Sequence, residues 1–295
     1  MLSQALAGGL TPEHWSIGVN YFEAKMKDAR ILIPQSEIRN PHSEMGGYLM
    51  SKAPKDPEEI FPGIIGNYTQ LFGDDLISVV LYGSAASGDY IPGKSDINFM
   101  IVLSEEGIDS LDQTFDLIAK GKKRNVTTPL FLTESYVSTS LDVFPIEYLN
   151  FQKTYKLVYG KDILKDLSFD RGFLRMQCER EVKAKLLLLR EAFLESQGKE
   201  KYLQQLIAQS LGAFVAIFNG LLHLKGEELP RHKRDVIKNV CQAFQMDTGL
   251  FEKLLDVKEK KVKLSSPDIN RLFKAYLKEV QKLWKIVDTL DKEVQ

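Results

Sequence analysis

The sequence predicts a two-domain protein, in which an α/β domain built on a small mixed sheet is followed by an all-α helical bundle. Between residues 57 and 165, short apolar runs typical of strands alternate with helical segments, which favours a sheet with helices packed on it. After about residue 170 the pattern changes to five amphipathic helices with no strand signal, which indicates an antiparallel bundle. The 295 residues are enough for two domains with ample cores.

Helix starts and the positions of proline and glycine set the expected boundaries. Thr11-Pro12-Glu13 combines a capping hydroxyl, a first-turn proline and an acid, as a helix start does, and a long loop follows over 30–55. Another helix begins at Pro57 and ends at Gly73. We therefore expect an N-terminal helix and loop extension over 1–56, the α/β domain over 57–168 and the helical bundle over 169–295.

The elements of each domain follow from the period of the apolar residues. In the α/β domain we expect a helix over 108–118, a turn at 159–162 and four strands, over Leu76–Tyr82, Ile97–Leu103, Thr128–Leu132 and Pro145–Phe151. In the bundle we expect helices over 173–195, 200–225, 231–245 and 249–258, and a long last helix that begins at Ser266-Pro267-Asp268.

Composition and charge narrow the class of protein. The net charge of −1 argues against a broad nucleic-acid-binding surface. Cys178 and Cys241 match no metal-binding spacing and no disulfide framework, which favours a reducing, cytoplasmic location. The sequence shows no signal-peptide pattern, and no stretch approaches the roughly 18 apolar residues of a membrane span, so we expect no membrane partner. A homodimer is left open.

The segment over 79–103 carries the strongest functional signal in the chain. An apolar run ends in Gly83-Ser84, a polar loop follows, and Asp96 opens a second apolar run with Asn98 two positions later. Side chains two apart on a strand share a face, so Asp96 and Asn98 are expected to point the same way. Two strands joined in this manner can bring a phosphate-holding turn beside a metal-binding strand end.

This pattern resembles the nucleotidyltransferase superfamily that includes DNA polymerase β and kanamycin nucleotidyltransferase. The family motif is Gly-Ser, a gap of about ten residues, and then Asp-x-Asp or Asp-x-Glu on the next strand; Gly83-Ser84 and Asp96-Ile97-Asn98 occupy those places here. The helical half resembles, in arrangement, the bundles that accompany minimal nucleotidyltransferases. The resemblance implies the nucleotidyltransferase fold for the sheet domain.

The resemblance also implies a function and a set of site residues. The implied reaction is transfer of a nucleoside monophosphate from a triphosphate, ATP in the first instance, to a hydroxyl of a small molecule or protein, with Mg²⁺ or Mn²⁺. Gly83 and Ser84 would bind the phosphates, because glycine lets the backbone approach closely. Asp96 would be the leading metal ligand. Lys94, in the loop between the motif halves, either neutralises phosphate charge or is simply solvated.

The superfamily takes a third carboxylate from a later strand, and two residues compete for that place. Glu147 lies in the middle of the predicted strand Pro145–Phe151, where a buried acid needs a metal or a partner. Asp142, just before Pro145, is the alternative. The predicted ligand set is therefore Asp96, Asn98 and Glu147, with Asp142 in place of Glu147 as the second choice, and Asp96 and Glu147 are the predicted catalytic residues.

Two departures from the family pattern support a different function. Asn98 replaces the second carboxylate and offers a hard cation one neutral oxygen without charge. Ala85-Ala86 stand where many relatives carry an arginine, so the triphosphate clamp is reduced. The alternative hypothesis is a catalytically degraded nucleotide-binding or protein-interaction module, with an antitoxin-like or regulatory role.

Overall fold

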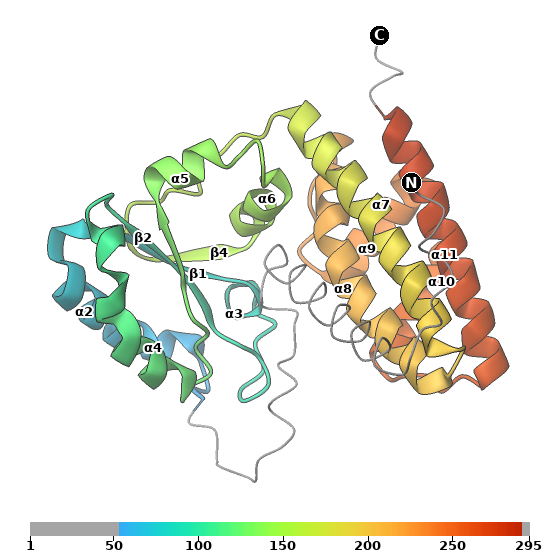
Figure 1. Cartoon of the computed structure of the whole chain (residues 1–295), viewed down its shortest axis with the longest axis horizontal. Coiled ribbons are helices and arrows are strands. Elements are labelled where there is room, and N and C mark those ends of the chain that lie inside the picture. Colours follow the sequence, from blue (N-terminus) through green and yellow to red (C-terminus); the bar gives the residue numbers. More distant parts are fainter. Residues whose placement is uncertain (1–52, 291–295) are drawn as a thin grey trace, which may run out of the picture.

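A computed structural model describes residues 53–290 of the chain. These residues form a four-stranded mixed sheet with helices on both faces and, beside it, a bundle of long helices (Figure 1). The predicted fold class, a mixed α/β sheet followed by an all-α bundle, is confirmed. The helix expected from Thr11 and almost all of the loop over 30–55 lie outside the described residues.

Three of the four strands lie where the sequence predicts them. They are β1 (Leu76–Tyr82), β2 (Asn98–Leu103) and β3 (Leu130–Thr133), all rich in apolar residues. The sheet order is β3-β2-β1-β4; β1 is antiparallel to β2 and β4, and β2 is parallel to β3. Tyr82 at the end of β1 pairs with Asn98 at the start of β2. The Gly83–Asp96 segment therefore connects the two central strands at one end of the sheet.

The predicted strand Pro145–Phe151 is wrong, because this segment is the helix α6 (Pro145–Lys153). Proline suits the first helical turn, where its missing N–H is not needed. Ile146 and Leu149 pack into the bundle core, while Tyr148 and Phe151 pack into a second core against the sheet. With apolar residues on two opposite sides, the helix lacks the single stripe of an amphipathic helix and imitates strand alternation.

The fourth strand comes later than expected. β4 (Tyr155–Gly160) includes the first half of the turn that was predicted at 159–162, and it pairs with β1 at the edge of the sheet. Gly160 has a φ of +79° where the chain leaves the strand, a conformation that favours glycine.

The face of the sheet opposite α6 is covered by α2 (Phe61–Phe72) and α4 (Phe115–Lys122) (Figure 1). A 3-10 turn, Pro57–Ile60, leads into α2 and is held by a capping box of Asp56 and Glu59. The 3-10 segment Gly107–Thr114 leads into α4, so the helix expected over 108–118 is confirmed in two pieces. Two short helices complete this half of the molecule, α3 (Ser84–Ser87) and α5 (Glu134–Thr139).

The bundle contains the five helices that the sequence predicts. They are α7 (Arg171–Ser196), α8 (Glu200–Leu224), α9 (Lys233–Ala243), α10 (Thr248–Lys258) and α11 (Ser266–Thr289). Side-chain oxygens of Asp170, Asp247 and Ser265 cap the backbone N–H groups that begin α7, α10 and α11. Helix α8 packs against the four other bundle helices and against α6, so it forms the centre of the bundle.

Helix α8 is also apolar and long enough, by composition alone, to cross a membrane, which the sequence analysis did not anticipate. Its most apolar window is 61% buried inside the protein, as the core helix of a bundle would be.

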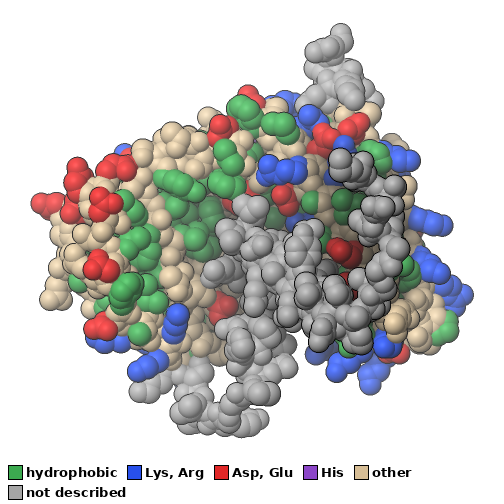
Figure 2. All heavy atoms as spheres, in the orientation of Figure 1, with side chains coloured by type: hydrophobic (Ala, Val, Ile, Leu, Met, Phe, Trp, Pro, Cys, Tyr) green, Lys and Arg blue, Asp and Glu red, His purple; other side chains and the backbone are tan. Residues whose placement is uncertain are grey.

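Charged side chains are unevenly spread on the face shown in Figure 2, where acidic groups gather at the outer end of the sheet half and basic groups along the outer edge of the bundle.

We predict that Gly160→Ala destabilises the protein by about 3 kcal/mol or more. A Cβ at this position would lie 2.0 Å from the Ile77 carbonyl oxygen, in addition to the positive φ. Gly93 is the matched control, because its φ is +72° and an added Cβ meets nothing within 4 Å. Gly93→Ala should cost only about 1–2 kcal/mol, the backbone term alone. Urea unfolding of both variants measures the difference, and equal losses would contradict the steric explanation.

Candidate functional site

The turn after β1 requires glycine and leaves a serine hydroxyl unpaired. Gly83 has φ 76° and ψ −152°, a backbone conformation that residues other than glycine rarely adopt. Its carbonyl oxygen accepts hydrogen bonds from the N–H groups of Ala86 and Ser87, both at 3.0 Å, which closes the turn. The half-buried Ser84 hydroxyl makes no hydrogen bond with any described residue. The predicted tight Gly-Ser turn at the end of the first strand is present.

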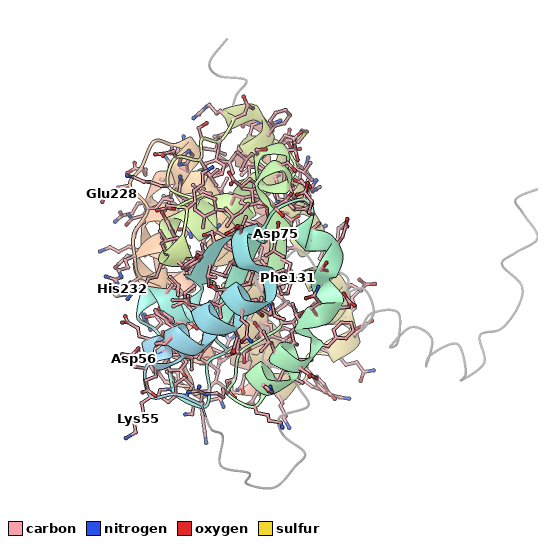
Figure 3. The ribbon with its side chains drawn as sticks, turned by 90° about the vertical axis from the view of Figure 1, so that its left-hand side faces the viewer. Lys55, Asp56, Asp75, Phe131, Glu228 and His232 are labelled. Atoms are coloured by element: carbon pink, nitrogen blue, oxygen red, sulfur yellow. The ribbon has the colours of Figure 1, made fainter. Side chains whose placement is uncertain are left out.

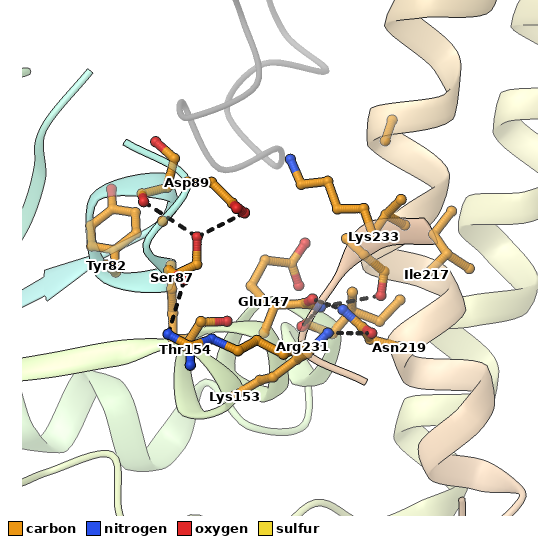
Figure 4. Close-up of a pocket in the computed structure, with 18 of the residues that line it drawn as sticks. Tyr82, Ser87, Asp89, Glu147, Lys153, Thr154, Ile217, Asn219, Arg231 and Lys233 are labelled. Carbon is orange, nitrogen blue, oxygen red and sulfur yellow. Dashed lines mark hydrogen bonds between the residues drawn. The ribbon is translucent and has the colours of Figure 1, made fainter. Parts of the chain in front are cut away.

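A cavity of about 140 Å³ lies between this turn, helix α6 and the bundle. In Figure 4, Tyr82, Ser87 and Asp89 lie on one side, Asn219 and Lys233 on the other, and Glu147 and Lys153 between them. Gly83 and Ser84 line it together with four basic side chains, Lys153, Lys185, Arg231 and Lys233, and three acidic ones, Asp89, Glu147 and Glu181. The cavity therefore joins residues from β1, α6, α7, α8 and the start of α9.

Lys153 is held in the cavity by a chain of buried amides that the sequence analysis missed. Asn150 donates hydrogen bonds to the carbonyl oxygens of Ile146, at 2.7 Å, and Ala216, at 3.1 Å. Its amide oxygen accepts from Asn219 at 2.6 Å, and the Asn219 oxygen accepts from the Lys153 ammonium at 2.9 Å. Lys153 thus has a neutral partner, and within the described part of the chain no acid pairs with it.

The environment of Lys153 disfavours its charged form. Burial, followed by the nearby charge of Lys233, lowers the pKa of Lys153 to about 8. Lys185 and Glu181, which also line the cavity, form an ion pair of 3.1 Å with both side chains largely buried, so these two charges neutralise each other. Arg231 donates a hydrogen bond to the Ser87 carbonyl oxygen at 3.1 Å and so links the bundle to the turn.

Asp96 lies just before β2 and is half-buried. Its carboxylate has no hydrogen bond or ion pair with any residue between 53 and 290, and burial raises its pKa. Because Tyr82 pairs with Asn98, Ser84 and Asp96 each lie two residues beyond the last pair of β1 and β2. Asp96 therefore lies at the same end of the sheet as the Gly-Ser turn, although it does not line the cavity.

Asn98 is fully buried and already engaged. Its side-chain oxygen accepts a hydrogen bond from the Thr127 hydroxyl at 2.8 Å, and its side-chain nitrogen has no partner. Neighbouring backbone bonds, from Ile97 N–H to the Asn125 carbonyl and from Thr127 N–H to the Ile97 carbonyl, fix the same strand edge. An amide oxygen held in this way supports strand pairing rather than a cation.

The other predicted site residues are spread over different places. Glu147 lines the cavity from α6, where Gln177 donates a 2.7 Å hydrogen bond to its carboxylate and burial raises its pKa. Asp142 is exposed in the turn before α6, and Lys94 is exposed in the loop before β2. Neither lines the cavity. Glu147 was expected on a strand next to the one that follows Asp96. Its segment is instead the helix α6, and the neighbours of β2 in the sheet are β1 and β3.

The donor set does not fit a two-metal centre. No group of three or more histidine, cysteine or acidic side chains in residues 53–290 could hold a metal ion. Asp96 is the one motif carboxylate without a partner, whereas the Asn98 oxygen and the Glu147 carboxylate are both hydrogen-bonded within the protein. Two adjacent cations need bridging carboxylates, which this arrangement does not supply.

Comparisons with known proteins show a likeness in structure but none in sequence. No family model matches the sequence, and no curated protein matches it. Among solved structures, the chain is similar to spectinomycin adenyltransferase AAD(9) from Enterococcus faecialis with ATP and spectinomycin, with 13% identity and a TM-score of 0.45. The match covers 76% of this chain and 99% of that one. It is a likeness of overall arrangement, and function has to be inferred from the site itself.

Asn98→Asp should destabilise the protein at pH 7 by about 2–4 kcal/mol, because it places a carboxylate where no water or cation reaches it. Burial would raise the pKa of the new acid above its unfolded value. The folded state would then hold the proton longer, so stability should fall as pH rises from about 4 towards that raised pKa.

Urea unfolding at pH 5 and pH 7 measures this pH dependence, with Asn98→Leu as an uncharged control of similar volume. A variant as stable as the wild type at pH 7, or one rescued by Mg²⁺, would show that position 98 reaches a cation after all.

Proposed function

We propose that this protein is a nucleotidyltransferase that binds a nucleoside triphosphate, ATP in the first instance, in the cavity between the sheet and the bundle. A hydroxyl of a small molecule or protein that reaches the cavity would attack the α-phosphorus, so that the nucleoside monophosphate is transferred to this hydroxyl and pyrophosphate leaves. One observation carries the proposal. The Gly83-Ser84 turn and the amine of Lys153, which no acid neutralises within the described residues, line the same cavity.

The turn suits a phosphate group. Gly83 lets a ligand approach the backbone closely, and the unpaired Ser84 hydroxyl can donate a hydrogen bond. The opposite wall supplies positive charge from Lys153, Arg231 and Lys233. Burial, and after it the charge of Lys233, lowers the pKa of Lys153; a bound polyanion would stabilise the charged form of Lys153, so binding and protonation favour each other. A bound triphosphate could therefore accept hydrogen bonds from the Gly-Ser turn and neutralise the basic side chains of the opposite wall at the same time.

Two acids are assigned roles in the proposal. Asp96 would meet the Mg²⁺ or Mn²⁺ ion that enters with the triphosphate, because it lies at the same sheet end as Ser84 and has no competing partner in the described part of the chain. Glu147 lines the cavity, and burial raises the pKa of its carboxyl towards the range in which a carboxylate accepts a proton from a hydroxyl. Its assignment moves from metal ligand to proton acceptor, since Gln177 holds it on the bundle side.

A second candidate function is nucleotide binding without transfer. It is favoured by the burial of Asn98 and by the lack of an acid cluster in residues 53–290. The two candidates differ in product. Incubation with α-labelled ATP and Mg²⁺ or Mn²⁺, alone and with a panel of polyols, aminocyclitols and hydroxyl-bearing proteins, distinguishes them. Label in an acceptor, lost in Glu147→Gln, supports transfer; tight binding without label in any acceptor supports the binding module.

Lys153→Met should weaken tripolyphosphate binding about tenfold or more, because it removes a charge-assisted contact. Tripolyphosphate with a chelator isolates the phosphate subsite from the metal. Lys94→Met is the matched control, since Lys94 is an exposed lysine outside the cavity and should change the affinity little. Calorimetry on the two variants measures the contrast. If Lys94→Met caused the larger loss, the phosphates would lie on the loop and not on α6.

Polyphosphate binding should be accompanied by proton uptake between pH 8 and about 10. Free Lys153 loses its proton around pH 8, and a bound polyanion restores its ordinary, higher pKa, so the complex holds more protons than the free protein in this interval. Affinity should accordingly fall as pH rises above 8. Calorimetry in buffers of different ionisation enthalpy counts the protons. The uptake should vanish in Lys153→Met, and an unchanged count there would assign it to another group.

Asp96→Asn should remove the Mg²⁺ dependence of ATP binding and leave tripolyphosphate binding in chelator intact. Because the Asp96 carboxylate is half-buried and has no partner within residues 53–290, the variant should be as stable as the wild type. Calorimetric titrations with and without Mg²⁺ measure the effect. An Asp96→Asn protein whose ATP binding still responds to Mg²⁺ would remove Asp96 from the metal site.

A further inference from the structure

A groove lies on the face of the sheet opposite the cavity, between α2, α4 and the segment that leads into β3. Its volume is about 190 Å³, larger than the roughly 150 Å³ cavity that accommodates a benzene molecule in a protein core. Figure 3 looks onto this side of the molecule, with α2 in blue and α4 in green. Its walls are mainly apolar and include Ile64, Leu117 and Ile118. The groove shares one residue, Thr127, with the surroundings of the motif.

Helix α2 leaves the groove open by means of a glycine that the fold itself does not need. Gly63 lies inside α2 and lines the groove, and a Cβ added there would meet nothing within 4 Å. Glycine within a helix costs roughly 1 kcal/mol relative to alanine. No close packing compensates that cost at Gly63 among the described residues, so its effect is to keep the wall of the groove free of a side chain.

A buried tyrosine whose hydroxyl has no partner among residues 53–290 lines the same groove. Tyr68 is 3% exposed and lines the groove, its burial raises its pKa to about 12, and its hydroxyl makes no hydrogen bond with any residue of the described range. The Tyr68 hydroxyl oxygen is nevertheless partly accessible. Among the described residues, the fully inaccessible side-chain polar atoms without a partner are Ser78 Oγ and Asn98 Nδ2. Buried hydroxyl groups in native proteins nearly always find a partner, so a ligand atom in the groove would complete this one.

Two basic side chains line the groove. Lys120 and Arg124 are exposed, line it from the end of α4 and the turn after it, and neither side chain has an acidic partner among residues 53–290. No acidic side chain lines the groove. The groove therefore presents an apolar interior, one hydrogen-bonding hydroxyl and unopposed positive charge, which together complement an amphipathic anion.

We propose that this groove binds a small organic carboxylate with an apolar body, such as a medium-chain fatty acid or an arylalkanoic acid. The apolar body would lie over Gly63 between α2 and α4, and the carboxylate would accept a hydrogen bond from the Tyr68 hydroxyl and meet the charges of Lys120 and Arg124. Thr127, which also lines the groove, donates its hydroxyl to Asn98, so an occupant would contact the residue that holds the motif strand. The proposal does not depend on the proposed function.

Octanoate is the probe, followed by calorimetry and by the methyl NMR signals of Ile64, Leu117 and Ile118. We expect saturable binding to the full-length wild type in the millimolar range or tighter, and at least tenfold weaker binding of octanol, which lacks the charge. Gly63→Leu should weaken octanoate binding at least tenfold by filling the groove.

Gly66→Leu is the matched control for the helix effect. Gly66 is also an α2 glycine with no atom within 4 Å of an added Cβ, but it does not line the groove. Both leucine variants should gain helix stability, and only Gly63→Leu should lose the ligand. Tyr68→Phe should weaken binding about fivefold without unfolding the protein. No saturable binding, octanol binding as tight as octanoate, or equal affinities in the two leucine variants would overturn the proposal.

Discussion

The whole arrangement depends on helix α6, which is buried from two sides. Its apolar residues divide between two cores, Ile146 and Leu149 on the bundle side and Tyr148 and Phe151 on the sheet side. Each such side chain stabilises the fold by roughly 1.5–3 kcal/mol when fully buried. The helix is therefore a wall that both halves of the molecule share. Because the same short helix also carries Glu147, Asn150 and Lys153, the packing that joins the halves sets where the polar groups of the cavity lie.

The chain of amides that holds Lys153 has one consistent orientation. Two backbone carbonyls, one on α6 and one on α8, accept from the Asn150 nitrogen, so its oxygen must face Asn219. Asn219 then donates to Asn150 and can only accept from Lys153. Networks of hydrogen bonds of this kind fix geometry more firmly than single contacts do. An acid in place of Asn219 would anchor the lysine equally well but would neutralise it. Neutral anchors leave the positive charge available to a ligand, which is why the cavity suits an anion.

Sequence reasoning succeeded where one physical signal dominated a segment. Central strands β1 and β2 and the five bundle helices follow from apolar periodicity, and the Gly83-Ser84 turn follows from the need for a positive φ after a strand. It failed for α6, since burial on two sides erases the amphipathic stripe, and for β4, a partly exposed edge strand with little alternation. It missed the Lys153 network because the partners lie 66 residues apart, at a separation that no local pattern encodes.

The position of Asn98 explains how this motif can differ from the nucleotidyltransferase pattern that it resembles and still form the same turn. The amide joins β2 to the segment before β3 through Thr127, so position 98 stabilises the sheet edge and is closed to a cation. An amide in that place avoids a buried charge, which would cost several kcal/mol without a cation beside it. Among residues 53–290, the Asp96 carboxylate has no partner, and it lies at the sheet end that Ser84 shares. A pair of metal ions would neutralise much of the negative charge of a bound triphosphate. In the proposed function, basic side chains must neutralise that charge instead. The cavity supplies them from α6 and the start of α9, so the neutral amide at position 98 and the basic wall of the cavity are two parts of the same electrostatic arrangement.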